Sequence, residues 1–207
     1  MLTPIEEALR RIRRGEMVLV VDDEERENEG DLTMAAEWVT PEAVNFMLRW
    51  GRGLVCMPAA GEVLDRLEIG PMVEQATADT AFCVSVDHRS AGSGIGAADR
   101  ATTIRRILDP RSRPEDFLRP GHVFPLRARD GGVLERRGHT EAAVDLARLA
   151  GLPPVAVICE VLHDDGSPAR LPYLELFCQE HRVPMVSVAQ VVAHREALEA
   201  SVPGAGA

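Results

Sequence analysis

Short apolar runs alternate along the chain with longer segments whose apolar residues recur at helical spacing. The short runs have strand length and predict strands at residues 16–21, 32–36, 53–57, 82–88, 155–161 and 185–188. The longer segments predict helices at residues 4–14, 41–50, 97–108, 139–150, 172–182 and 189–200. Strands that alternate with helices indicate an α/β fold, in which helices cover a sheet.

Helix boundaries carry local signals. Thr3 predicts a cap with Pro4 at the first helical position, and Thr40 with Pro41 repeats this arrangement. Gly15 is expected to end the first helix.

The length of 207 residues suits one large domain, predicted over residues 1–200, with a frayed tail at 201–207. Between residues 76 and 137 the pattern of apolar residues predicts strands less clearly. Antiparallel pairing of strands is an alternative for this segment. No internal repeat or linker divides the chain.

Composition narrows the possible partners. The formal net charge of −10 argues against non-specific binding to nucleic acid or to an anionic membrane surface. An anionic substrate would then need local Arg residues or a metal ion. No apolar stretch has the length of a membrane span, and no signal-peptide core opens the chain. The four cysteines form no CxxC pair, so reduced core thiols and a cytoplasmic location are expected.

An acidic loop, Asp22–Asp31, lies between two predicted strands, and seven of its ten side chains are acidic. Carboxylate oxygens are the ligands that hard cations such as Mg²⁺ prefer. In an extended segment, Glu27 and Glu29 would face one side and Arg26 the other. Composition alone leaves a metal-binding loop and a solvated mobile loop equally open.

A second segment, Arg119–Ala142, concentrates positive charge in this acidic chain. His122 and His139 lie there in Gly-containing turns and not on apolar stripes, which favours a functional role over a core role. His139 and Thr140 open a predicted helix, whose first N–H groups favour an anion. Thr140 either caps this helix or binds a phosphate oxygen.

Glu160 ends an apolar strand, so partial burial is expected to raise its pKa and suit it to proton transfer. An ordinary strand-end charge that faces water is the alternative. Cys56 is best interpreted as a small core residue. The glycine-rich segment 92–99 matches neither a dinucleotide fingerprint nor a P-loop, and predicts a turn that can lie near a phosphate.

Four motifs in this order, DDEERENEGDL, RPGHVFPLRA, GHTEAAVDLARLAG and ICE, resemble 3,4-dihydroxy-2-butanone-4-phosphate synthase of riboflavin biosynthesis. The resemblance implies a lyase that converts D-ribulose 5-phosphate into L-3,4-dihydroxy-2-butanone 4-phosphate and formate. It also implies a single-domain three-layer sandwich with a mixed sheet, in a homodimer whose active sites lie near the interface. Mg²⁺ or Mn²⁺ is the expected cofactor, with two ions per active site.

The resemblance also assigns residues. Glu27 and His139 are the implied metal ligands, and His122 and Glu160 the implied catalytic residues. The implied substrate-binding residues are Arg26, Glu27, Asp31, Arg136, Arg137, Gly138, His139, Thr140 and Glu160. Arg137 departs from the family pattern, which commonly has Gly before the Gly-His-Thr sequence.

Two other functions use the same residue types. A metal-dependent sugar-phosphate isomerase or aldolase would share the ligands but release no formate. A non-catalytic sugar-phosphate-binding module would need the anion site without reactive His122 and Glu160. Some family members continue into a GTP cyclohydrolase II domain, and the sequence leaves open whether this chain is free-standing or the N-terminal part of such a fusion.

Overall fold

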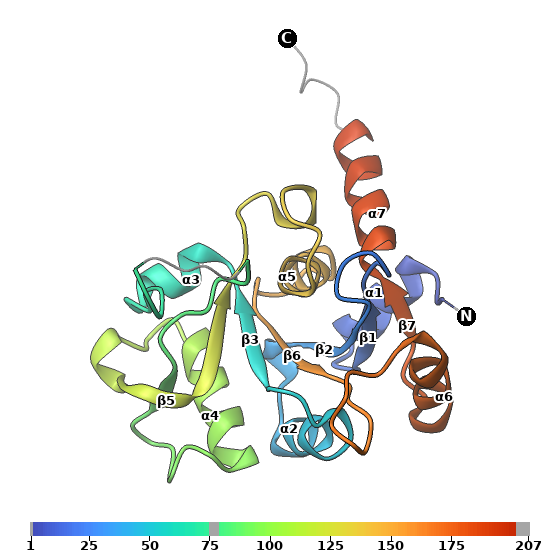
Figure 1. Cartoon of the computed structure of the whole chain (residues 1–207). Coiled ribbons are helices and arrows are strands. Elements are labelled where there is room, and N and C mark those ends of the chain that lie inside the picture. Colours follow the sequence, from blue (N-terminus) through green and yellow to red (C-terminus); the bar gives the residue numbers. More distant parts are fainter. Residues whose placement is uncertain (1, 75–78, 202–207) are drawn as a thin grey trace.

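The computed structural model describes residues 2–74 and 79–201 (Figure 1). Its described residues form a seven-stranded sheet in the order β4-β5-β3-β6-β2-β1-β7. The strands are β1 (Val18–Val21), β2 (Gly30–Ala35), β3 (Cys56–Ala59), β4 (Val86–His88), β5 (Phe117–Arg127), β6 (Ala156–Glu160) and β7 (Met185–Ser187). The pairs β1/β7 and β3/β5 are parallel and the others are antiparallel, so the sheet is mixed as expected.

Helices cover both faces of this sheet. The α-helices are α1 (Ile5–Arg13), α2 (Pro41–Phe46), α3 (Gly61–Arg66), α4 (Ala97–Leu108), α5 (His139–Leu149), α6 (Leu171–His181) and α7 (Val188–Ser201). Shorter turns are η1 (Ala36–Trp38), η2 (Met47–Gly51), η3 (Pro114–Asp116) and η4 (Gly132–Leu134). Helices α1, α5 and α7 lie on one side of the sheet, and α2, α4 and α6 on the other (Figure 1).

Alternation along the strands explains the layers. In β1, Val18 and Val20 pack into the core that contains α1, α5 and α7, whereas Leu19 packs into the core that contains α2, α4 and α6. Successive side chains of a strand point to opposite faces. The three-layer arrangement predicted from the resemblance is therefore confirmed.

Two helix signals have different outcomes. Thr40 accepts a hydrogen bond from the N–H of Ala43 and caps α2, as predicted. Thr3 does not cap α1, because that helix begins at Ile5 after Pro4, without a side-chain cap. The Thr3 N–H instead donates to the carbonyl of Met185, 2.7 Å away, which joins the N-terminus to β7.

The sheet region around residues 76–137 departs most from prediction. The strand expected at 82–88 is reduced to β4, and the open alternative of antiparallel pairing is realised between β4 and β5. Strand β5 was not predicted, because Pro120, Gly121 and Pro125 are residues that strands disfavour. The prediction that His122 lies in a turn is consequently wrong, since it lies within β5.

The helix predicted at residues 189–200 agrees with α7 (Val188–Ser201) to within one residue at each end. Ser201, which was assigned to the tail, is the last residue of α7. The rest of the predicted tail, residues 202–207, lies outside the described residues. Along the described chain, no helix has both the length and the apolar character needed to cross a membrane.

Candidate active site

A small cavity of about 140 Å³ lies where the acidic loop, the start of α5 and the ends of β2 and β6 meet. It is lined by Arg26, Glu27, Glu29, Asp31, Cys56, Thr80, Phe82, Leu126, Arg136, His139, Thr140, Ile158 and Glu160. The antiparallel register of β2 and β6 places Asp31 directly opposite Glu160. The fold thus gathers most of the predicted site residues from three segments that are distant in sequence.

Asp22 organises the acidic loop from inside. Its carboxylate accepts hydrogen bonds from the N–H groups of Glu27, at 3.1 Å, and Glu29, at 2.8 Å. Arg26 also donates to Asp22, at 2.8 Å, and to the Glu27 carboxylate, at 2.7 Å. The loop is therefore turned and not extended, and Arg26 lines the same cavity as Glu27 and Glu29. The expectation that Arg26 faces the opposite side is wrong for this reason.

Arg170 holds the same loop from outside. Its guanidinium donates to the carbonyl oxygens of Glu27, at 2.6 Å, and Asn28. Asn28 has a φ of 54°, in the left-handed region that Asn tolerates better than most residues. The turn at Asn28 leaves the Glu27 carboxylate 3.4 Å from Nδ1 of His139.

His139 and Asp31 are buried polar side chains with unused hydrogen-bonding atoms. Nε2 of His139 and Oδ1 of Asp31 have no hydrogen-bond partner among the described residues. Buried polar atoms normally have partners, so these two indicate a ligand in the cavity. Burial is the main cause that raises the pKa of Asp31.

The charges around His139 and Glu27 stabilise each other. Burial alone would lower the pKa of His139, but the carboxylates of Asp31 and Glu27 raise it to about 9. The interaction with His139 is the main cause that lowers the pKa of Glu27 to about 2. The protonated imidazole of His139 is therefore balanced by the carboxylates beside it.

These donors fit a divalent cation. Ligand atoms of Asp22, Glu27 and His139 all lie within 4.8 Å of one another. Two carboxylates and one imidazole suit Mg²⁺ or Mn²⁺, which favour oxygen ligands. The unpartnered Nε2 of His139 is the observation that supports this fit.

Arg136 and the first turn of α5 also line the cavity. Arg136 donates through Nε to Asp79 at 2.6 Å, through Nη1 to Glu141 at 2.6 Å and through Nη2 to Thr80 at 3.3 Å. Gly138 precedes α5 as its N-cap residue. A Cβ atom there would collide with Arg136, so glycine allows this close approach.

Thr140 lies in the first turn of α5 and lines the cavity. Because Gly138 occupies the capping position, the alternative in which Thr140 caps the helix is not realised. Thr140 and the first N–H groups of α5 then remain available to an anion in the cavity.

Glu160 is held at the rim by backbone. Its Oε2 accepts a hydrogen bond of 2.8 Å from the N–H of Leu54. Cys56 lines the cavity and is also buried in the core, as predicted, and burial strongly raises the pKa of its thiol. The four cysteines are unpaired, in agreement with the sequence.

His122 does not line this cavity. Its Nδ1 lies 2.6 Å from Oδ2 of Asp87, and its N–H donates to Oδ1 of the same carboxylate at 2.9 Å. The His122 side chain is 44% exposed. Gly94, with a φ of 86°, lies so close that a Cβ atom there would collide with Asp87. His122 is thus firmly oriented but separated from the other predicted catalytic residue, Glu160.

The family model of 3,4-dihydroxy-2-butanone 4-phosphate synthase matches residues 6–194. The chain belongs to this family. Relatives named riboflavin biosynthesis protein RibBA are 55% identical over 196 residues in Aquifex aeolicus and 51% identical over 197 residues in Bacillus subtilis. These matches cover 92% and 94% of this chain but 48% and 50% of the relatives. The chain spans about half the length of the curated relatives it matches.

Solved structures of synthases share the fold. RibBX from A. baumannii, described as a two-domain 3,4-dihydroxy-2-butanone 4-phosphate synthase, is 44% identical with a TM-score of 0.90, over 93% of this chain and 58% of that chain. A synthase described as a complex with two magnesium ions is 40% identical with a TM-score of 0.91, over 97% of this chain and 100% of that chain.

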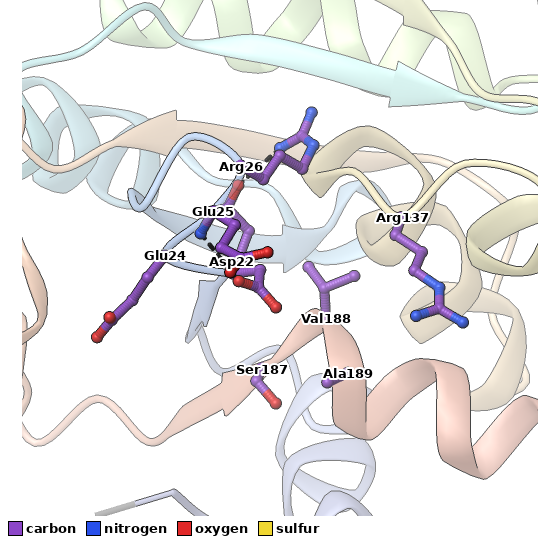
Figure 2. Close-up of a pocket in the computed structure, with 9 residues that line it drawn as sticks. Asp22, Glu24, Glu25, Arg26, Arg137, Ser187, Val188 and Ala189 are labelled. Atoms are coloured by element: carbon purple, nitrogen blue, oxygen red, sulfur yellow. Dashed lines mark hydrogen bonds and ion pairs between the residues drawn. The ribbon is translucent and has the colours of Figure 1, made fainter.

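Arg137, which replaces the Gly common in the synthase family, lies outside the cavity. It lines a separate cleft of about 780 Å³ with Asp22–Arg26 and residues 187–189 (Figure 2). Arg137 is not among the described non-glycine residues with positive φ, so the turn accommodates a side chain without strain. Gly138 lies against Arg136, where a Cβ atom would meet the guanidinium.

The glycine-rich segment is also accounted for without a ligand. The N–H groups of Gly92 and Gly94 donate to the Asp99 carboxylate, at 2.9 and 3.1 Å. These donors are therefore occupied by the chain itself, and a phosphate near them is not indicated.

Several residues that shape the synthase site were missed from the sequence. Thr80, Phe82, Leu126 and Ile158 line the cavity, and Asp22, Asp79 and Glu141 hold its polar groups. Asp87 holds His122, which lies outside the cavity. Four of these residues, Asp79, Thr80, Phe82 and Asp87, lie outside the four motifs. Asp79 and Asp87 also have partners that are distant in sequence. Glu141 was the most accessible to prediction, because it follows His139 and Thr140 in the first turn of a predicted helix.

Proposed function

We propose that this chain converts D-ribulose 5-phosphate into L-3,4-dihydroxy-2-butanone 4-phosphate and formate, as a step of riboflavin biosynthesis. The observation that carries this proposal is the meeting of Glu27, His139, Asp31, Glu160 and Arg136 in one small cavity of a synthase-family chain. The two products together contain all atoms of the substrate. The reaction therefore needs proton transfers and carbon–carbon bond changes, but no outside oxidant.

Glu27 and His139 would hold the divalent cation, with Asp22 close enough to assist. A bound cation supplies a Lewis acid that makes the proton beside the ketose carbonyl more acidic. Two Mg²⁺ or Mn²⁺ ions per site are proposed, and the two magnesium ions described for a 40% identical synthase support this number.

The remaining cavity residues divide the substrate between two ends. Arg26 and Asp31 line the cavity and would form hydrogen bonds with the sugar hydroxyls near the cation. Arg136, which precedes α5, and Thr140, in its first turn, line the cavity where charge-assisted bonds and the helix N-terminus favour the phosphate. Arg137 and Gly138 support this end as neighbours in sequence, without direct contact in the cavity.

Glu160 and His122 are the proposed proton-transfer residues. Glu160 lines the cavity and is steadied by the Leu54 N–H, so its carboxylate can take up and return a proton at the sugar. Asp87 fixes the ring of His122, as carboxylates commonly do for functional imidazoles. His122 can act only if the reacting sugar comes within hydrogen-bonding reach of it.

A homodimer would meet this requirement. Exposed apolar side chains lie in the segments next to both groups: Leu54 beside Glu160, and Ile95 and Leu118 near His122. Burial of such residues stabilises protein interfaces. In the proposed dimer, His122 of each copy completes the cavity of the other.

Mixing two inactive variants tests the dimer. Glu160→Gln and His122→Ala, unfolded together and refolded as a mixture, should regain part of the activity, because mixed dimers contain one intact pair. The same variants refolded separately serve as controls. If mixed dimers form but no activity returns, His122 does not complete the cavity of the other copy. It would then act on substrate bound by its own chain, or have no part in the reaction.

A formate assay tests the function itself. Incubation with ribulose 5-phosphate and Mg²⁺ should release formate, and excess chelator should stop the release. An isomerase or aldolase would consume the substrate without formate. A cytoplasmic location also remains a proposal, supported by the unpaired state of all four cysteines.

A further inference from the structure

The guanidinium of Arg136 already has partners on each of its three nitrogens. Nε donates to Asp79, Nη1 to Glu141 and Nη2 to Thr80. A phosphate bound in the bidentate manner that Arg favours needs two N–H groups on one edge. The edge formed by Nε and Nη2 becomes available only if Asp79 moves away.

The two acidic partners of Arg136 differ in their surroundings. The Glu141 side chain is 2% exposed, and its other oxygen accepts the N–H of Arg129 at 3.1 Å. The Asp79 side chain is 72% exposed, and its carboxylate forms an ion pair with Arg136. Glu141 is thus a fixed part of the site, whereas Asp79 is an exposed partner that can be displaced at low cost.

Charge decides the effect of Asp79 on an anion. With both acidic partners in place, Arg136 is surrounded by two negative charges and contributes one positive charge. A phosphate dianion would then approach a group with net charge −1. Without Asp79, Arg136 and Glu141 neutralise each other, and the N-terminus of α5 adds a favourable field.

We infer that Asp79 is a specificity-determining residue that competes with the substrate phosphate for Arg136. This inference rests on the proposed function, in which Arg136 binds the phosphate end of the sugar. Asp79 occupies Nε in the free protein and leaves when a phosphate arrives. Its presence weakens the binding of every phosphorylated ligand, and it has no such effect on the unphosphorylated sugar.

Asp79→Asn tests this inference, because the substitution removes the charge and keeps the shape. The inhibition constant of inorganic phosphate and the KM of ribulose 5-phosphate should both fall about twofold to fivefold, the scale of a surface ion pair. The gain should shrink in high salt, which screens exposed charges. Binding of unphosphorylated ribulose, measured by calorimetry, should not change.

Asp65→Asn is a matched control. Asp65 is 67% exposed and pairs with Arg127, a basic residue that does not line the cavity. This variant should leave the inhibition constant of phosphate unchanged. An equal gain in both variants would show a general effect of net charge and would overturn the inference.

Arg136→Lys separates this inference from the proposed function. Weaker phosphate inhibition in Arg136→Lys, with no gain in Asp79→Asn, would overturn the role of Asp79 alone. Unchanged phosphate inhibition in Arg136→Lys would place the phosphate elsewhere and overturn both. Weaker inhibition in Asp79→Asn would show that Asp79 supports Arg136 and does not compete.

Discussion

The two histidines singled out in the sequence lie in regions of opposite character. His139 is buried in the cavity, with one ring nitrogen near Glu27 and the other without a partner. His122 lies outside the cavity, partly exposed, with its ring fixed by Asp87. An unused buried nitrogen indicates a ligand that binds there, whereas an oriented exposed ring indicates a group that acts on something brought to it. We therefore propose that the two histidines serve different steps, although both follow glycine in similar motifs.

The largest loss of activity is expected when the region around His139 loses its metal ligand. Glu27→Gln should reduce turnover by about 10³-fold, because the Lewis acid contributes several kcal/mol to the barrier. Calorimetry should show that Mg²⁺ binding is lost, while the thermal midpoint changes little, since an exposed loop contributes little packing. Glu25→Gln in the same loop is the control. Normal Mg²⁺ binding by Glu27→Gln would remove Glu27 from the metal site.

His122→Ala should give a smaller loss, about 10²–10³-fold in kcat, as is common for a proton-transfer group. Mg²⁺ binding should be unchanged, because His122 lies outside the cavity. Loss of Mg²⁺ binding together with activity in this variant would contradict the separate roles of the two histidines, since both would then belong to one site.

Metal binding should depend on pH through His139. Its pKa is raised to about 9, so the imidazole of the metal-free protein is protonated at neutral pH and must lose its proton to bind a cation. The apparent Mg²⁺ affinity should rise by up to about tenfold per pH unit and level off above the pKa. Calorimetry in two buffers with different ionisation enthalpies counts the released proton. An affinity that falls with rising pH would contradict this assignment.

The smallest effect is expected for Arg170, which contacts the loop backbone and not the metal. Arg170→Met should weaken Mg²⁺ binding by about tenfold, the scale of a residue that orients a ligand. Turnover at saturating Mg²⁺ should be nearly normal. Arg52→Met is the control, because Arg52 also donates to a backbone carbonyl, that of Leu162 at 3.0 Å. Equal loss in both variants would indicate general loosening of the fold.

The sequence predicted best where a feature is local. The acidic loop, the start of α5 and the end of β6 are each visible in a few consecutive residues, and their apolar flanks have clear periodicity. His139 and Glu160 could therefore be selected from the residues themselves, whereas Glu27 was singled out among the loop carboxylates by the family resemblance. The cavity lining confirms that they meet.

Features that depend on distant contacts could not be predicted in this way. Strand β5 forms despite its prolines, because it pairs with β3 and β4 on either side. The pairing of β4 with β5 also brings Asp87 to His122, which is 35 residues away in sequence. The partners of Arg136 likewise include Asp79, which is 57 residues away in sequence. The cluster of Arg residues therefore indicated an anion site, but it gave no sign that Asp79 competes with the anion for Arg136.

One labelling experiment tests the central claim most directly. Ribulose 5-phosphate that carries ¹³C only at C4 is incubated with the protein and Mg²⁺, and the products are followed by NMR. The proposed skeletal rearrangement predicts that the label appears in formate and is absent from the four-carbon phosphate. Label retained in a phosphorylated sugar, with no labelled formate, would contradict the synthase activity.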